Sequence, residues 1–70
     1  MNSYIWHTNK EIPVKGRGEV LISKTIGTFK LHWVGHYNHE KNTYAISNGF
    51  WLRNNFVDKW AYIDEIENLI

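Results

Sequence analysis

Large apolar residues alternate with polar ones through the middle of the chain, from residue 28 to residue 37. The apolar positions are Phe29, Leu31, Trp33 and Tyr37, and the polar positions are Lys30, His32 and His36. Successive side chains of a strand point to opposite faces, so this period of two predicts a half-buried strand. We expect its apolar face, in particular Phe29, Leu31 and Trp33, to belong to the core.

An Asn-Gly pair at residues 48–49 separates two further apolar runs, residues 43–47 and 50–53. Asn-Gly favours a two-residue type I′ hairpin turn, because both central residues of that turn need a positive φ. Such a turn pairs Ser47 with Phe50 and Tyr44 with Arg53. One face of the hairpin then carries Tyr44, Ile46, Trp51 and Arg53, and the other carries Ala45, Ser47, Phe50 and Leu52. Either the sheet curls to cover both apolar faces, or one of them is left for a partner.

Residues 19–26 alternate in the same way, and Gly27 can turn the chain directly into the next strand. Upstream, residues 15–18 (Lys-Gly-Arg-Gly) form a turn by composition, and Pro13 excludes a helix at that point. The spacing of Tyr4 and Trp6 predicts an edge strand, or an extended arm that docks Trp6 onto the core.

The last segment supports two interpretations. From Phe56 onward apolar residues recur at spacings of three and four, which is typical of a helix. However, residues 60–63 (Trp-Ala-Tyr-Ile) favour a strand, and Asp64 with Glu67 forms a capping box for a shorter helix after it. The two interpretations differ in whether Trp60 lies on a strand. Either way the sequence predicts a mainly β, small α+β fold: a twisted antiparallel sheet or partly open barrel of four or five strands with a short C-terminal helix.

Seventy residues predict a single domain, residues 1–70, whose folding buries only ~60% of the surface of the unfolded chain. The 4 Trp, 4 Tyr and 3 Phe side chains can supply a compact core without disulfide or metal cross-links. The absence of cysteine excludes disulfides and thiolate metal sites and fits a reducing compartment. No stretch approaches the ~20 apolar residues of a membrane span, and no secretory signal opens the chain. We therefore expect a cytoplasmic protein with no membrane partner.

The side chains that carry chemistry are few. His32 and His36 are four residues apart, which on a strand is ~13 Å, too far to share one zinc ion unless a bulge at Gly35 shortens the distance. Neither the serines nor the acidic residues near the C-terminus show the spacing of a nucleophile and its base. We expect no enzymatic activity, no metal and no cofactor. The formal net charge is only +1, a weak basis for nucleic-acid binding.

Several short motifs follow one another in a recognisable order. They are Trp6, Ile12-Pro13, a turn with Gly16 and Gly18 leading into Glu19-Val20-Leu21-Ile22, Gly35-His36-Tyr37, and Trp60-Ala61-Tyr62-Ile63. In this order the chain resembles a short uncharacterised family common in bacteriophages and prophages, a domain of unknown function. Its members open with Trp and Leu-Pro, pass through Glu-Val-Leu-Val, and close with His-Trp and a proline-bearing end.

The resemblance spans nearly the whole chain and departs from the family at two positions. Lys59 stands where the family often has His, and Asp64 stands where it has the terminal Pro. The resemblance implies a small sheet-based fold, a phage setting and a strand around Trp60. It transfers no catalytic residue.

Trp, Tyr and Arg are enriched among the residues that dominate binding energy at interfaces. The predicted partner-binding surface comprises Tyr44, Ile46, Trp51 and Arg53 together with Lys30, His32 and His36. We hypothesise a noncatalytic phage or prophage module that occupies and inhibits a host protein such as a nuclease, polymerase or immune effector, an anti-defence role in the host cytoplasm. Two alternatives remain: a sponge that holds a small nucleotide signal between aromatic residues across a homodimer interface, and a nucleic-acid binder that uses Lys24, Lys30, His32, His36 and Arg53.

Overall fold

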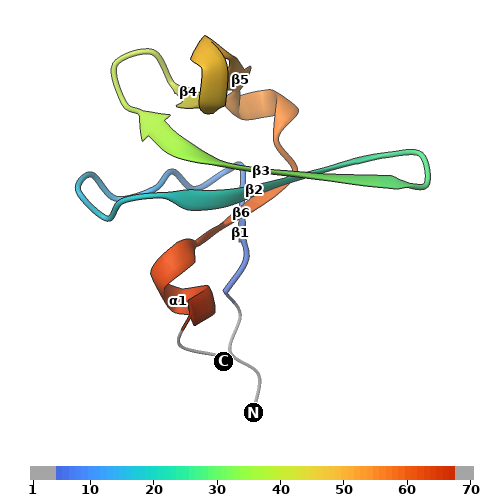
Figure 1. Ribbon diagram of the computed structural model, residues 1–70, viewed down its shortest axis with the longest axis horizontal. Coiled ribbons are helices and arrows are strands. Elements are labelled where there is room, and N and C mark those ends of the chain that lie inside the picture. Colours follow the sequence, from blue (N-terminus) through green and yellow to red (C-terminus); the bar gives the residue numbers. More distant parts are fainter. Residues whose placement is uncertain (1–4, 68–70) are drawn as a thin grey trace.

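A computed structural model describes residues 5–67 of the chain. Its strands form one open antiparallel sheet in the order β1-β6-β2-β3-β4-β5 (Figure 1). The elements are β1 (His7–Thr8), β2 (Val20–Ile26), β3 (Phe29–Asn38), β4 (Thr43–Ala45), β5 (Trp51–Arg53), β6 (Lys59–Tyr62), the helix α1 (Ile63–Glu67), and the single-turn 3-10 helices η1 (Ser47–Gly49) and η2 (Asn54–Phe56). The predicted mainly β fold with a short C-terminal helix is confirmed, with 6 strands instead of the four or five expected. No helix of the described part of the chain is long and apolar enough to cross a membrane.

The predicted hairpin of β2 and β3 is confirmed. Its register pairs Ile26 with Phe29 at the turn and Val20 with Gly35 at the far end. Gly27 has a φ of 61° and the φ of Thr28 is not positive, the pattern of a type II′ turn, which needs glycine at its first central position. The turn residue and the alternation therefore act together to form this hairpin.

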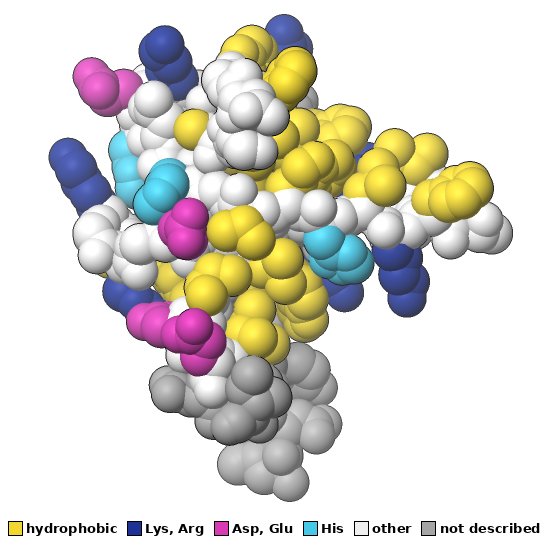
Figure 2. Space-filling view, viewed as in Figure 1, with side chains coloured by type: hydrophobic (Ala, Val, Ile, Leu, Met, Phe, Trp, Pro, Cys, Tyr) yellow, Lys and Arg dark blue, Asp and Glu magenta, His cyan; other side chains and the backbone are white. Residues whose placement is uncertain are grey.

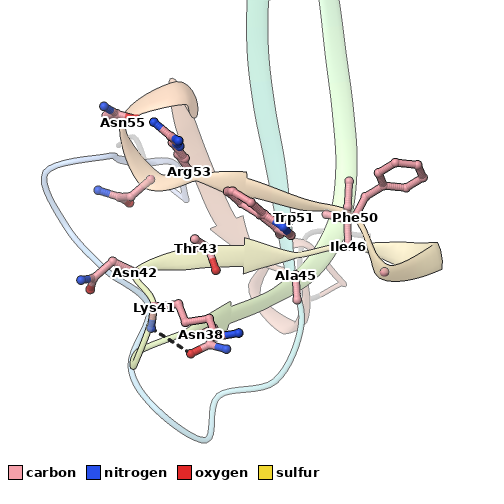
Figure 3. A pocket seen from close by; sticks show the side chains of 12 residues that line it. Asn38, Lys41, Asn42, Thr43, Ala45, Ile46, Phe50, Trp51, Arg53 and Asn55 are labelled. Atoms are coloured by element: carbon pink, nitrogen blue, oxygen red, sulfur yellow. Dashed lines mark hydrogen bonds between the residues drawn. The ribbon is translucent and has the colours of Figure 1, made fainter.

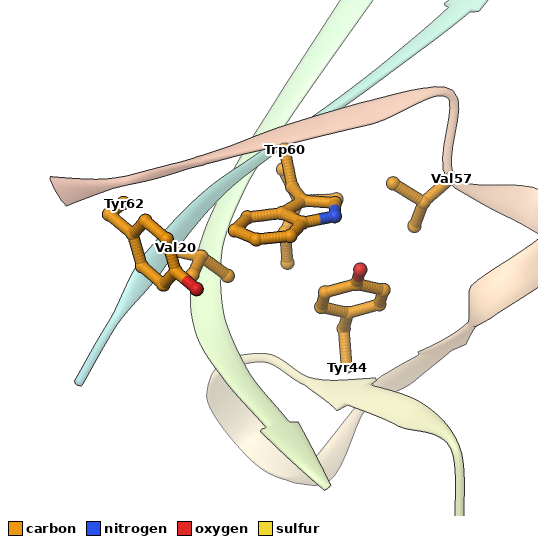
Figure 4. Packing of buried hydrophobic residues seen from close by; sticks show 6 residues of the cluster. Val20, Tyr44, Val57, Trp60 and Tyr62 are labelled. Carbon is orange, nitrogen blue, oxygen red and sulfur yellow. The ribbon is translucent and has the colours of Figure 1, made fainter. Parts of the chain in front are cut away.

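The core lies on the inner face of the sheet, where β4 and the segment before β6 fold over β2 and β6. Its buried residues are Val20, Ile22, Tyr44, Val57, Trp60 and Tyr62 (Figure 4). Trp33, Tyr37, Ile46 and Leu52 pack against this cluster at partial burial. Edge contacts join the rings, with centroids 4.9 Å apart both for Tyr37 with Tyr44 and for Trp60 with Tyr62. Aromatic side chains thus supply most of the volume of the core, as the composition predicts.

Residues 9–14, which we call the strap, run across the end of this core. Side-chain hydrogen bonds hold the strap. Trp60 Nε1 donates to the Glu11 carbonyl at 3.0 Å, and the Tyr62 hydroxyl accepts the Val14 N–H at 2.8 Å. His39 Nε2 lies 2.7 Å from the Pro13 carbonyl, and Asn9 Nδ2 donates to the Val57 carbonyl at 2.8 Å. Upstream, β1 pairs with β6 at the sheet edge, so an edge strand is present, but at His7–Thr8, directly after the predicted segment. Trp6 lies under Lys59, with Nζ 4.6 Å from the ring centroid, and the predicted contribution of Tyr4 lies outside the described residues.

Trp60 lies on a strand, which decides between the two interpretations of the C-terminal segment. β6 pairs with β2 through Ile22 and Trp60, and α1 follows without a loop. The helix begins at Ile63, one residue before Asp64, so Asp64 lies in its first turn and not at the N-cap. There the carboxylate of Asp64 accepts a bond from Arg17 Nη2 at 3.1 Å.

The register predicted for the hairpin of β4 and β5 is wrong by one residue. Tyr44 pairs with Leu52 and Ala45 pairs with Trp51, whereas a two-residue turn would pair Tyr44 with Arg53. Asn48 and Gly49 have the positive φ values expected of Asn-Gly, 63° and 78°, but Ser47 joins them in η1. Because a one-residue slip moves side chains to the opposite face, Tyr44 and Trp51 no longer lie on the same face.

The expectation that Phe29 and Leu31 belong to the core is also wrong. Phe29 is 71% exposed and Leu31 is 38% exposed, and Trp33 is only partly buried. The reason is that the hairpin extends past its neighbours: β6 pairs with β2 at residues 20–23, and β4 pairs with β3 at residues 36–38. The distal half of the hairpin projects from the body of the protein (Figure 1).

Candidate functional site

The register of the sheet sorts the predicted partner-binding residues onto its two faces. Residues directly opposite each other share a face, and neighbours along a strand alternate. Lys30, His32 and His36 alternate with the inner-face residues of β3. His36 pairs with Ala45, and Ala45 with Trp51, which brings Trp51 and then Arg53 onto the same side as the β3 residues. We call this side the outer face.

Five of the predicted site residues therefore share the outer face, and all five are exposed: Lys30, His32, His36, Trp51 and Arg53. The other two do not join them. Tyr44 is fully buried in the core, and Ile46 packs against the core at partial burial. The one-residue shift of the hairpin register accounts for this division.

Trp51 and Arg53 line an open groove of about 720 Å³ over β4 and β5 (Figure 3). Its lining comprises the apolar Ala45, Ile46, Phe50 and Trp51, the cations Lys41 and Arg53, Gly49, and the polar Asn38, Asn42, Thr43, Asn54 and Asn55. Among residues 5–67, none of those that line it is acidic. Trp51 is 56% exposed and Phe50 is 67% exposed, so the groove presents aromatic surface and positive charge together.

Close backbone contacts shape the strands that carry the groove. Gly35 lies where β3 leaves β2 and meets β4, and a Cβ at this position would collide with the carbonyl oxygen of Ala45. A glycine is therefore needed for β4 to approach β3 this closely. In the turn between β3 and β4, Asn42 has a φ of 55° and its Oδ1 accepts the Tyr37 hydroxyl at 3.1 Å. This bond holds one rim of the groove.

The groups with shifted pKa values lie elsewhere. Burial raises the pKa values of Tyr44 and Tyr37. The N–H of Thr25, donated to Asp58 Oδ2 at 2.7 Å, lowers the pKa of Asp58, and a bond to Asp64 raises that of Arg17. None of these four groups lines the groove. The groove offers apolar contacts and positive charge.

Lys24, which belonged to the nucleic-acid alternative, does not join the outer face. It pairs with Leu31 in the ladder and so lies on the inner side. Its Nζ is 3.4 Å from Asp58 Oδ1 and 4.8 Å from the Phe56 ring centroid. This cation is already engaged within the protein.

The histidines are dispersed among separate contacts. His7 stacks on Trp60 with centroids 4.4 Å apart, His36 Nε2 lies 3.8 Å from Glu19 Oε2, and His39 contacts the strap. Within residues 5–67, no group of three or more His, Cys, Asp or Glu side chains is placed to hold a metal ion.

Sequence reasoning missed most of the groove lining, namely Phe50, Lys41 and the asparagines. The only signal was the recurrence of Asn around the hairpin, at positions 38, 42, 48, 54 and 55. Asn is frequent in turns, so this recurrence indicated loops and did not reveal that the loops converge. Comparison of the chain with protein-family models, curated proteins and solved structures found no match.

Proposed function

We propose that the protein is a noncatalytic binding module, of the phage or prophage setting that its motifs imply, which occupies and inhibits a bacterial host protein. Its contact surface is centred on Trp51 and Arg53 in the groove over β4 and β5. The observation that carries this proposal is the exposure of Trp51 beside a cation in a groove without acidic lining.

The energetic argument rests on the aromatic side chain. Covering the exposed half of an indole, on the order of 100 Å², contributes roughly 2–3 kcal/mol. Exposed Trp and Arg side chains that a partner encloses are the residue types that dominate interface energies. Phe50, which is 67% exposed, widens the apolar part of the contact.

The charge of the groove indicates the chemistry of the partner. Lys41 and Arg53 line it, and no carboxylate from the described part of the chain does, so a partner surface with acidic side chains beside an apolar patch would complement it. Lys30, His32 and His36 lie on the same outer face along β3, with the exposed Val34 between His32 and His36. A host nuclease, polymerase or immune effector that presents such a surface is the target that we propose.

A second candidate function, binding of single-stranded nucleic acid, is favoured by one specific observation. Lys30, His32, His36 and Arg53 share the outer face with Trp51, which could stack on a base. In that case affinity would fall steeply with salt concentration, whereas an apolar protein contact would be much less sensitive.

The test is capture from bacterial host lysate with the tagged protein, followed by mass spectrometry. We compare the wild type with the double variant Trp51→Ala, Arg53→Glu and with Phe29→Ser, a control that changes an exposed aromatic residue on the projecting hairpin. We expect one stoichiometric host protein with the wild type and the control, and affinity at least about 100-fold weaker (~2.8 kcal/mol) with the double variant. Circular dichroism checks that each variant is folded.

Unchanged affinity of the double variant would exclude the groove as the contact surface. Recovery of nucleic acid alone, released by raised salt, would replace the proposal with the second candidate.

A further inference from the structure

One backbone edge of the projecting hairpin is open. β4 pairs with β3 only at residues 36–38, so the side of β3 that faces away from β2 has no strand partner before His36 within the described residues. In a hairpin with a two-residue turn, the residues that flank the turn form a hydrogen-bonded pair, here Ile26 and Phe29. The alternate residues Lys30, His32 and Val34 therefore direct their N–H and C=O groups to the open side.

The opposite edge of the hairpin, along β2, is protected. The Thr25 N–H donates to Asp58 Oδ2 at 2.7 Å, and the Asp58 N–H donates to the Ser23 carbonyl at 3.0 Å. These bonds also support the assignment of backbone directions, because they place Thr25 N–H on the side away from β3. Proteins protect strand edges that would otherwise pair with other chains, so the unprotected edge of β3 stands out.

We propose that the open edge of β3 pairs with the same edge of a second copy of this chain. The pairing is antiparallel about a twofold axis at His32, an isologous contact in which each copy uses the same residues. It places Lys30 opposite Val34 of the partner subunit and Leu31 opposite Trp33 of the partner subunit. Phe29 falls opposite Gly35 of the partner subunit, at the end of the open edge where the pairing of β3 with β4 begins.

The side chains of this segment suit a second copy. Phe29 is 71%, Leu31 38% and Val34 47% exposed, and hydrophobic side chains continue along the projecting hairpin (Figure 2). Lys30 is the only Lys or Arg between residues 29 and 35, and those residues include no Asp or Glu. In the proposed register Lys30 faces Val34, and the two copies of Lys30 are separated by four residues along the strand, ~13 Å.

The size of the contact sets its expected strength. Pairing two strands of this length would bury on the order of 500 Å² per copy, below the ~800 Å² per partner of a standard interface. We therefore expect a weak dimer with a dissociation constant in the micromolar range or above. The inference does not depend on the proposed function, because it rests on the backbone edge of β3 and not on Trp51 or Arg53.

Sedimentation velocity from about 1 µM to about 1 mM protein tests the proposal. We expect the mass to rise from 8.4 kDa toward twice that value with concentration. His32→Pro should abolish association and keep the monomer folded, because the N–H that it removes faces the open edge. Circular dichroism and thermal unfolding of the variant check that the monomer is intact.

Charge variants test the register itself. Val34→Lys places like charges opposite each other and should weaken association at least 10-fold, and Lys30→Glu in the same chain should restore it. A monomer over the whole concentration range would overturn the proposal. A dimer that Val34→Lys leaves unchanged would also overturn it.

Discussion

At the scale of single residues, Tyr44 differs most from its predicted role. The sequence places it on an exposed face, but its ring is fully buried among Val57, Trp60 and the rest of the core (Figure 4). Within the described residues, its hydroxyl has no hydrogen-bond partner. Burial raises its pKa, because the phenolate would be desolvated.

Tyr44→Phe keeps the ring and removes the unpartnered hydroxyl. We expect the free energy of unfolding near pH 7 to stay equal or to rise by up to about 1 kcal/mol, because a buried hydroxyl without a partner costs desolvation energy. The pH dependence follows from the raised pKa. The unfolded chain ionises near pH 10 while the folded protein keeps its proton, so wild-type stability falls as pH rises above about 10.

Urea unfolding near pH 7 and near pH 11 measures both effects. The Tyr44→Phe variant should lose less stability than the wild type between these two conditions. A loss of more than about 1 kcal/mol near neutral pH would show that the hydroxyl makes a stabilising bond and would contradict this account.

At the scale of elements, the strap joins the two ends of the fold. It crosses the core end between β6 and the turn after β3, and it is held by side chains rather than by a strand ladder. Tyr62 contacts both the strap and the turn that follows it. Its hydroxyl accepts the Val14 N–H at 2.8 Å, and its ring centroid lies 3.8 Å from the Arg17 guanidinium carbon. Local sequence could not predict these contacts, because they join residues far apart in the chain, 48 positions for Val14 and Tyr62.

Tyr62→Phe should loosen the strap without removing the ring. The Val14 N–H loses its acceptor, so we expect a loss of about 1 kcal/mol in the free energy of unfolding and faster trypsin cleavage after Lys15 and Arg17. Limited proteolysis followed by mass spectrometry measures the cleavage sites. Tyr37→Phe is the matched control, because its hydroxyl bonds to Asn42 outside the strap. Equal cleavage rates in the two variants would contradict the proposed role of Tyr62.

The elements themselves were largely predictable from local patterns. Alternation and Gly27 predicted the hairpin of β2 and β3. Around Trp60 the local pattern left strand and helix open, and only the resemblance favoured the strand that became β6. The length of the turn at Asn48 and Gly49 was not predictable, because positive φ at both residues occurs in a two-residue turn and also in the longer loop found here. The resulting one-residue shift in register decided which side chains of β4 and β5 face outward.

At the scale of the whole molecule, the extent of each covering strand decides what is exposed. The alternation in β3 correctly separates its two faces, but only neighbouring strands determine where a face is covered. β6 and β4 end before the distal part of the hairpin, which leaves Phe29 and Leu31 in solvent. The groove similarly arises where the loops after β3, β4 and β5 converge, and its exposed Trp51 was predicted whereas most of its polar lining was not.

The central claim is that the groove over β4 and β5 contacts a host protein. Site-specific photo-crosslinking tests it most directly, with a crosslinking side chain at Asn55 on the groove and, as a control, at Thr28 in the exposed turn of the hairpin. After illumination in host lysate, we predict one host protein attached through position 55 and none through position 28. A host protein attached only through position 28, or none at position 55 although the wild type captures one, would contradict the claim.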